Sequence, residues 1–193
     1  MIVQCFRNTS RVYGLPLPDR EGIVGNIGMT LRKQMECYFG KLSDDLFNEY
    51  RKTHMAFQLK IYREHLQLCP GVTDALQFLH ERRKPCAVVT SRMPETLTVY
   101  LRETGIYHYF SALITPQSTA RHKPDPEPVL EALKRLDGVP EQTLFTGDSA
   151  FDIECGNRAG VATAFVTWSH NPVELLSQTP DYYFSDMRDL SVW

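Results

Sequence analysis

Apolar residues recur at helical spacing through the first third of the chain. Three stripes carry them, made of Ile2, Val3, Phe6, Val12 and Tyr13, of Leu31, Met35 and Phe39, and of Leu46, Tyr50, Phe57 and Ile61. Side chains three or four positions apart share one face of a helix, so this pattern predicts amphipathic helices packed on one another up to about residue 66. Ser43 is expected to cap the third helix, because its hydroxyl can accept a bond from a first-turn amide. The prolines and glycines of 13–28 predict a linker between helices.

After Cys69 the pattern changes to short apolar runs that alternate with amphipathic segments. The expected strands are 85–90, 111–115, 143–147, 162–168 and 181–184. The expected helices are 69–83 (with Thr73 as N-cap), 94–105, 125–138, 152–160 and 172–178. Uninterrupted apolar strands between amphipathic helices indicate a parallel sheet with helices on both faces. The predicted fold is therefore α/β and Rossmann-like, with a helical domain at 1–66 and a core domain at 67–193.

Composition and charge narrow the classes of function. The net charge of -2 at pH 7 favours neither nucleic acid nor an acidic membrane surface as a partner. The 5 cysteines are scattered and form no C-x-x-C pair, so the sequence predicts neither a disulfide framework nor a zinc site. Apolar runs fall short of the roughly 20 residues that a membrane-spanning helix requires, and the first residues lack a signal-peptide pattern. We expect a cytoplasmic protein.

Polar residues with complementary chemistry follow three of the predicted strands. They are Thr90, Ser91 and Arg92 after the first strand, Lys123 after the second, and Asp148 and Asp152 after the third. In a parallel sheet the carboxyl ends of the strands meet at one edge, where ligands bind. A hydroxyl, main-chain N–H groups and a lysine can hold phosphate oxygens, and carboxylate oxygens suit Mg²⁺. The group therefore predicts a site for a phosphate with a divalent cation.

Each of these residues also has an ordinary structural explanation. Thr90 can cap a helix, and Lys123 can be a solvated charge at a helix start. Asp148 can cap the helix that follows it, and Asp152 can favour the same helix from its first turn. The functional interpretation depends on their joint placement, in this order, at successive strand ends.

This combination resembles the haloacid dehalogenase-like (HAD) hydrolase superfamily. Thr90, Lys123, and Asp148 with Asp152 match its second, third and fourth motifs. The closer similarity is to the phosphoglycolate phosphatase and pyrophosphatase branch, over essentially all of 65–190, in VVTSRMPETL, HKPDPEPVLEALKRL, TGDSAFDI, NRAGVATAFVTWS and PDYYFSDMRDL. Through YGLP and IVGNIGMTL, residues 1–66 resemble the small helical cap of that branch, which closes over the active site and selects substrate.

The resemblance implies Mg²⁺-dependent hydrolysis of a small phosphorylated metabolite or pyrophosphate through an aspartyl-phosphate intermediate. By the same resemblance, the metal ligands are Asp148 and Asp152, the substrate is bound by Thr90, Ser91, Arg92 and Lys123, and Thr90 and Lys123 are also catalytic. Ser149, next to a metal ligand, is expected to order the loop. Two alternatives stay open: a phosphate-binding or interaction module without activity, and a phosphomutase similar to β-phosphoglucomutase. The sequence names neither the substrate nor the oligomeric state.

One motif of the superfamily does not occur in the 193 residues. By the resemblance, a nucleophilic aspartate and an acid/base aspartate two positions later belong to a D-x-D-G-T signature, at the end of the first, central strand of the sheet. The first aspartate here is Asp19, with no strand before it. We expect a phosphatase shortened by that strand and its catalytic loop, roughly 15–25 residues at typical element lengths, with an internal methionine as its start. This form is expected to be inactive.

Overall fold

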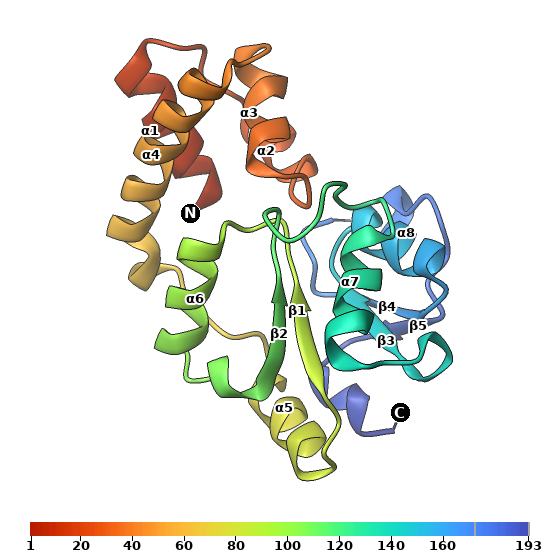
Figure 1. Ribbon diagram of the computed structural model, residues 1–193. Helices are drawn as coiled ribbons and strands as arrows, with labels where there is room; N and C mark the ends of the chain where they lie inside the picture. Colours follow the sequence, from red (N-terminus) through yellow and green to blue (C-terminus); the bar gives the residue numbers. More distant parts are fainter. Residues whose placement is uncertain (172, 193) are drawn as a thin grey trace. The chain divides into compact units, whose positions relative to one another are not determined.

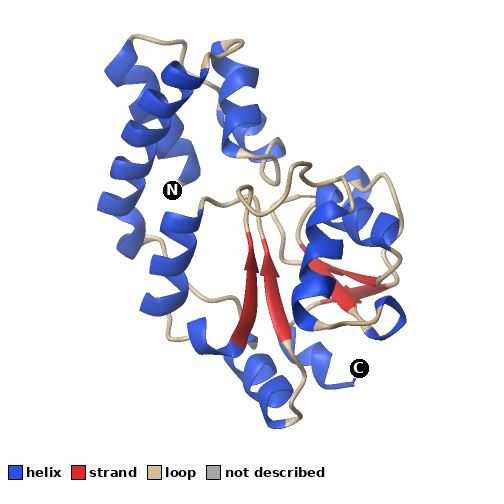
Figure 2. Ribbon diagram, viewed as in Figure 1, coloured by secondary structure: helices blue, strands red, loops and turns tan. Residues whose placement is uncertain are grey.

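The two parts of the chain differ in architecture. The computed structural model describes residues 1–171 and 173–192. The chain divides into two compact units, Met1–Leu66 and Gln67–Trp193. The first unit is helical, whereas the second alternates helices with strands (Figures 1 and 2). Within the described residues, every helix is too short or too polar to cross a membrane.

The first unit confirms the helices that the apolar stripes predict. Its elements are α1 (Ile2–Tyr13), α2 (Arg20–Gly25), α3 (Leu31–Phe39), α4 (Asp44–Ile61) and the 3₁₀ turn η1 (Tyr62–Glu64). Residues from all three stripes share one core with Ile23 and Leu42, built around the buried side chains of Phe6, Met35 and Tyr50. The expected cap of α4 is also present, because the Ser43 hydroxyl accepts a bond from the Leu46 amide at 3.3 Å.

The segment predicted as a linker contains a short helix. Asp19 caps α2, with its Oδ1 accepting from the Gly22 amide at 2.6 Å. Ile23 of this helix is fully buried in the core of the unit. The linker prediction is therefore wrong for these residues: burial of one isoleucine and a side-chain cap stabilise a helix too short to show a periodic pattern.

The second unit confirms the predicted alternation. Its strands are β1 (Cys86–Val89), β2 (Phe110–Ile114), β3 (Leu144–Gly147), β4 (Ala162–Val166) and β5 (Tyr182–Phe184). Its α-helices are α5 (Val72–Glu81), α6 (Pro94–Glu103), α7 (Glu127–Leu136) and α8 (Ala150–Ala159). Short 3₁₀ segments complete it, namely η2 (Tyr107–Tyr109), η3 (Pro140–Gln142), η4 (Val173–Leu175) and η5 (Met187–Val192).

Two local predictions need correction. Thr73 is not the N-cap of its helix, because α5 begins at Val72 and is preceded by Gly71 in the left-handed conformation at φ 74°. A side chain at Gly71 would collide with the Asp186 carboxylate and the Arg188 main chain, so packing against η5 sets this boundary. The helix predicted at 172–178 is only the 3₁₀ turn η4, and its first residue, Pro172, lies outside the described residues.

The strands are parallel, as predicted, but the described residues form two sheets instead of one. β1 pairs with β2 in the first sheet, and β3, β4 and β5 follow one another in the second. Figure 2 shows the two sheets as separate groups of arrows. Within the described part of the chain, β1 and β3 are therefore edge strands, each with one edge that has no strand partner.

The strands β1 and β3 are less buried than β4, which has a partner on each side. All residues of β1 and β3 are half-buried, although most of them are apolar. In contrast, β4 is buried from Thr163 to Val166. Helix α7 contacts both strands of the first sheet and also α8, which contacts β3 and β4. The helices thus join the two sheets, while the strands that end them stay partly exposed.

Candidate functional site

A buried ion pair links the loop after β2 to the helix after β3. The Lys123 Nζ donates to Asp152 Oδ1 at 2.5 Å, and the two side chains are only 8% and 6% exposed. Burial disfavours the charged ammonium, but the Asp152 carboxylate, supported by Asp148, outweighs this and raises the pKa of Lys123. Two residues that the sequence placed after different strands therefore meet, and Lys123 is held as a cation.

The second oxygen of Asp152 organises the turn between β3 and α8. Asp152 Oδ2 accepts from the Asp148 amide at 3.3 Å, the Ser149 amide at 3.1 Å and the Ser149 hydroxyl at 2.6 Å. Gly147 allows this arrangement, since a Cβ there would collide with the Asp152 side chain. Ser149 therefore orders the loop, as expected. Asp152 orders the same loop through Oδ2, which accepts all three of these hydrogen bonds.

Asp148 lies on the exposed side of the same turn. Its main-chain oxygen accepts from the Ser169 hydroxyl at 2.6 Å and from Asn171 Nδ2 at 3.0 Å. Protein atoms that displace water from the carboxylate raise the pKa of Asp148, the Asp152 charge raises it further, and Lys123 opposes the shift. Two carboxylates thus face one lysine, which leaves the site with excess negative charge.

Thr90, Ser91 and Arg92 form a separate turn at the end of β1. The Thr90 amide donates to the Ile114 carbonyl of β2 at 2.9 Å, and the Thr90 Oγ1 accepts from the Arg92 amide at 3.1 Å. The Arg92 guanidinium lies over the ring of Tyr100, at 4.7 Å from its centre. The turn is connected to the Lys123 group through the pairing of β1 with β2, since Lys123 follows β2 in the chain.

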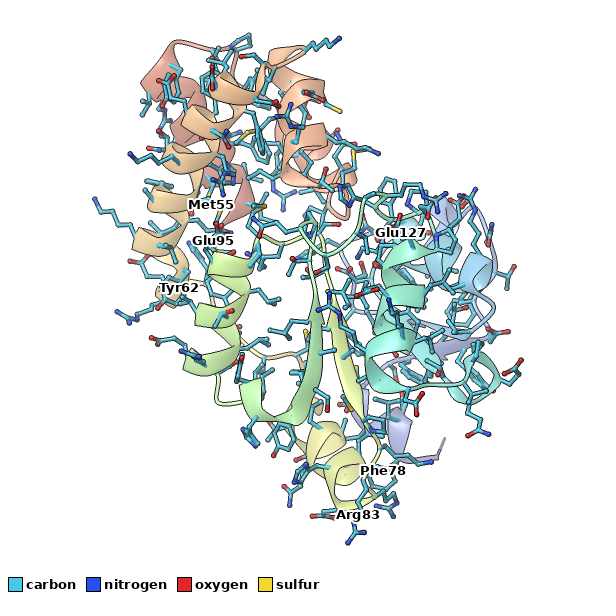
Figure 3. The ribbon with its side chains drawn as sticks, viewed as in Figure 1. Met55, Tyr62, Phe78, Arg83, Glu95 and Glu127 are labelled. Carbon is cyan, nitrogen blue, oxygen red and sulfur yellow. The ribbon has the colours of Figure 1, made fainter. Side chains whose placement is uncertain are left out.

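The loop that carries Lys123 is held by Glu127, which Figure 3 labels on α7. The Glu127 carboxylate accepts from the amides of Ala120 and Arg121, at 3.0 and 2.8 Å, and from Arg121 Nε at 3.1 Å. These main-chain bonds lower the pKa of Glu127. Asp125 Oδ1 accepts in turn from the Glu127 amide at 3.0 Å, so the loop is fixed on both sides of Lys123.

The donor set fits a hard divalent cation with few protein ligands. Mg²⁺ keeps several waters and usually takes one or two protein carboxylates. Asp148 offers a carboxylate at the exposed side of the turn, while both oxygens of Asp152 already accept hydrogen bonds. The part of the chain that the structure describes contains no group of three or more His, Cys, Asp or Glu able to hold a metal. The ligand roles of Asp148 and Asp152 stay predictions.

Ser169 and Asn171 are the polar residues that the sequence analysis missed. They lie in the turn after β4, at the carboxyl end of a strand, where the same rule that found Lys123 and Asp148 applies. A serine and an asparagine in a turn have an obvious local use, so the sequence pattern alone does not identify them. Their side chains instead reach the Asp148 main chain, 21 and 23 residues earlier.

Comparison with known proteins assigns the family. A family model described as haloacid dehalogenase-like hydrolase matches residues 1–166. The chain belongs to this HAD-like hydrolase family. Members typically use Mg²⁺, and the match covers the turns that carry Thr90, Lys123 and Asp148.

Individual relatives place the chain in one branch of the family. It is 31% identical over 191 residues to the pyrophosphatase PpaX of Anoxybacillus flavithermus, covering 98% of this chain and 87% of that protein. It is 36% identical over 155 residues to PpaX of Oceanobacillus iheyensis, covering 76% and 72%. A crystal structure of a predicted phosphoglycolate phosphatase from Haemophilus somnus aligns with TM-score 0.79 at 25% identity, covering 99% and 89%. The branch is therefore PpaX pyrophosphatase and phosphoglycolate phosphatase-like.

Proposed function

We propose that this chain carries the phosphate-binding and metal-binding part of a Mg²⁺-dependent phosphohydrolase for pyrophosphate or a small phosphate ester. The observation that carries the proposal is the buried Lys123–Asp152 pair beside Asp148. A lysine kept cationic in a buried position suits phosphate oxygens, and an adjacent carboxylate suits Mg²⁺. The similarity to PpaX pyrophosphatases supports pyrophosphate as the first substrate to test.

Each residue of the candidate site then has a defined role in binding the phosphate or the metal. Lys123 would attract the substrate phosphate and balance the nearby carboxylates, while Asp152 orients the lysine and the Asp148 turn. The Thr90 hydroxyl keeps its proton for a phosphate oxygen, because it accepts rather than donates in its bond to the Arg92 amide. The Ser91 N–H and Arg92 would add further donors to the phosphate. When bound at Asp148, Mg²⁺ would neutralise charge on the transferring phosphoryl group.

We infer that the nucleophile comes from outside these residues. No D-x-D-G-T occurs in the 193 residues, and Asp19, the first aspartate, caps helix α2. The half-buried strands β1 and β3 each have an edge without a strand partner in the described part of the chain. We propose that a strand between these edges supplies the attacking aspartate, with a second aspartate two residues later as acid and base. Unassisted, the 193-residue chain would bind phosphate without turning it over.

The helical unit Met1–Leu66 has a proposed role in the same reaction. The resemblance to a small helical cap suggests that it selects the substrate. Aromatic rings pack against one another in its core. The ring centre of Phe6 lies 5.3 Å from that of Tyr38 and 4.9 Å from that of His54. A unit with its own aromatic core can move as one body, which a substrate-selecting cap requires.

Hydrolysis of pyrophosphate tests the proposal. The 193-residue chain and a form extended at its N-terminus by a designed strand ending in D-x-D-G-T would be assayed with Mg²⁺. We expect phosphate release only from the extended form, and its loss when Asp148 is replaced by Asn. An extended form that folds and binds phosphate without hydrolysing it would instead support the non-enzymatic binding module. Phosphate release by the unextended chain, abolished by Asp148→Asn, would contradict the need for an added nucleophile.

A further inference from the structure

Two side chains from the turn after β4 converge on one main-chain atom of the candidate metal ligand. The Ser169 hydroxyl donates to the Asp148 carbonyl oxygen at 2.6 Å, and Asn171 Nδ2 donates to the same oxygen at 3.0 Å. The Asn171 amide also donates to Ser169 Oγ at 2.9 Å, so the serine has a defined orientation. We refer to Ser169 and Asn171 together as the brace.

The brace is itself anchored to the second sheet. The Ser169 amide donates to the Val166 carbonyl at the end of β4, at 3.2 Å. Both the amide and the hydroxyl of Thr167 donate to the Phe184 carbonyl in β5, at 2.9 and 3.1 Å. The turn after β4 is therefore fixed to two strands, and the brace transmits their position to Asp148.

Asp148 consequently has its main chain held on both sides. Its amide donates to Asp152 Oδ2 at 3.3 Å, and its carbonyl accepts from the brace. Gly147, immediately before it, is the last residue of β3 and pairs with Phe165, so beyond the end of the strand these bonds hold the main chain of Asp148. The orientation of the main chain sets the direction of the Cα–Cβ bond, from which the carboxylate projects.

We propose that Ser169 and Asn171 are positioning residues that hold the Asp148 carboxylate in its metal-binding orientation. This inference rests on the proposed function, in which Asp148 binds the divalent cation. Neither residue needs to touch the metal or the substrate. A site held within a fraction of an ångström by supporting hydrogen bonds binds its ligand more tightly than one left free to rotate.

The test is a Mn²⁺ titration of the full chain, followed by electron paramagnetic resonance. We expect Ser169→Ala and Asn171→Ala each to raise the Kd for Mn²⁺ about fivefold, the loss that one hydrogen bond represents. The double variant should raise it at least tenfold. Ser169→Thr keeps the hydroxyl, so its Kd for Mn²⁺ should stay near the wild-type value. Asp148→Asn removes the proposed metal-binding carboxylate itself, so its Kd for Mn²⁺ shows the effect of losing the ligand.

Thr167→Val is the matched control. It removes the hydrogen bond that the Thr167 hydroxyl, in the same turn, donates to the Phe184 carbonyl. The bonds to the Asp148 carbonyl stay in place. We expect it to lower the melting temperature about as much as Ser169→Ala does and to leave the Kd within twofold. Equal weakening by Thr167→Val, or wild-type affinity in the double variant, would overturn the proposal.

Hydrogen exchange without metal separates this proposal from the proposed function. In the double variant the amides of Asp148 and Ser149 should exchange at least tenfold faster, and the Thr167 amide should be unchanged. A wild-type chain that does not bind Mn²⁺ would contradict the metal site, while unchanged exchange at Asp148 in the double variant would contradict the brace itself.

Discussion

Two strand-to-helix turns carry the candidate phosphate site, and they are stabilised differently. The Asp148 turn after β3 is tied to distant segments, through Lys123 to Asp152 across 29 residues and through Ser169 to Asp148 across 21. The Thr90 turn after β1 rests on the Arg92 amide and on its neighbouring strand, through Ile114. The hydrogen bonds given for the first turn therefore come from distant segments of the second unit, whereas those of the Thr90 amide and hydroxyl go to β2 and to their own turn.

Breaking the buried ion pair should have the largest effect. Lys123→Ala leaves the Asp152 carboxylate buried without its partner, so the free energy of unfolding should fall by about 3–5 kcal/mol. Urea unfolding followed by circular dichroism measures it. Arg135→Ala, which removes the more exposed i,i+4 pair with Glu131 and a 3.4 Å bond to the Leu113 carbonyl, is the control and should cost about 0.2–1 kcal/mol. Equal losses in the two variants would show that the Asp148 turn does not depend on the pair.

Adding one methyl group tests the close approach in the same turn. Gly147→Ala puts a Cβ against the Asp152 side chain, and this overpacking should cost about 1–3 kcal/mol of unfolding free energy. Gly25→Ala is the control, because a Cβ there meets no atom within 4 Å and its φ is not left-handed. The control should be neutral or slightly stabilising. A Gly147→Ala variant as stable as the wild type would contradict the close contact.

The Thr90 turn should be less sensitive. Thr90→Val keeps the shape of the side chain and removes the acceptor for the Arg92 amide, which should cost about 0.5–1.5 kcal/mol of unfolding free energy. Phosphate binding should suffer more than stability, since the hydroxyl proton is the proposed donor to the ligand. Urea unfolding and phosphate titration of the same sample separate the two effects, and a loss of stability comparable to Lys123→Ala would contradict the comparison.

The smallest effect concerns pH. The pKa of Asp148 is raised above 3.8 in the folded state, so the folded protein binds the proton more tightly than the unfolded chain does. Stability contributed by this group is therefore lost as pH rises from about 3.8 through the raised pKa. Relative to the wild type, Asp148→Asn should become more stable across that window. A difference in unfolding free energy that does not vary with pH would contradict the raised pKa.

The sequence predicted that Lys123 and the Asp148–Asp152 turn lie together better than it predicted the pairing of the strands, and their roles in binding stay predictions. Lys123, Asp148 and Asp152 could be found because each follows an apolar run, and parallel strands bring such positions to one edge. The brace could not be found in this way, because its two bonds to Asp148 depend on how the turn after β4 lies beside the turn after β3. Local patterns carry no information about that tertiary arrangement.

Prediction of the fold has the same limit, because local patterns do not report tertiary contacts. Periodicity identified the strands and most helices, but it missed α2, a six-residue helix held by Asp19 and by burial of Ile23. It also placed the cap of α5 at Thr73, where packing of Gly71 against η5 decides the start instead. The arrangement of the strands as two sheets depends on which edges find partners, and strand patterns alone do not report pairing.

We propose that the Asp148 turn and Lys123 already form a phosphate and metal site in this chain. Isothermal titration of the 193-residue protein with orthophosphate, in the presence and absence of Mg²⁺, tests it most directly. We expect binding that requires Mg²⁺, is lost in Asp148→Asn and is at least tenfold weaker in Lys123→Met, with both variants folded by circular dichroism. Phosphate binding that is independent of Mg²⁺ and unchanged in both variants, or its absence from the folded wild type, would contradict the claim.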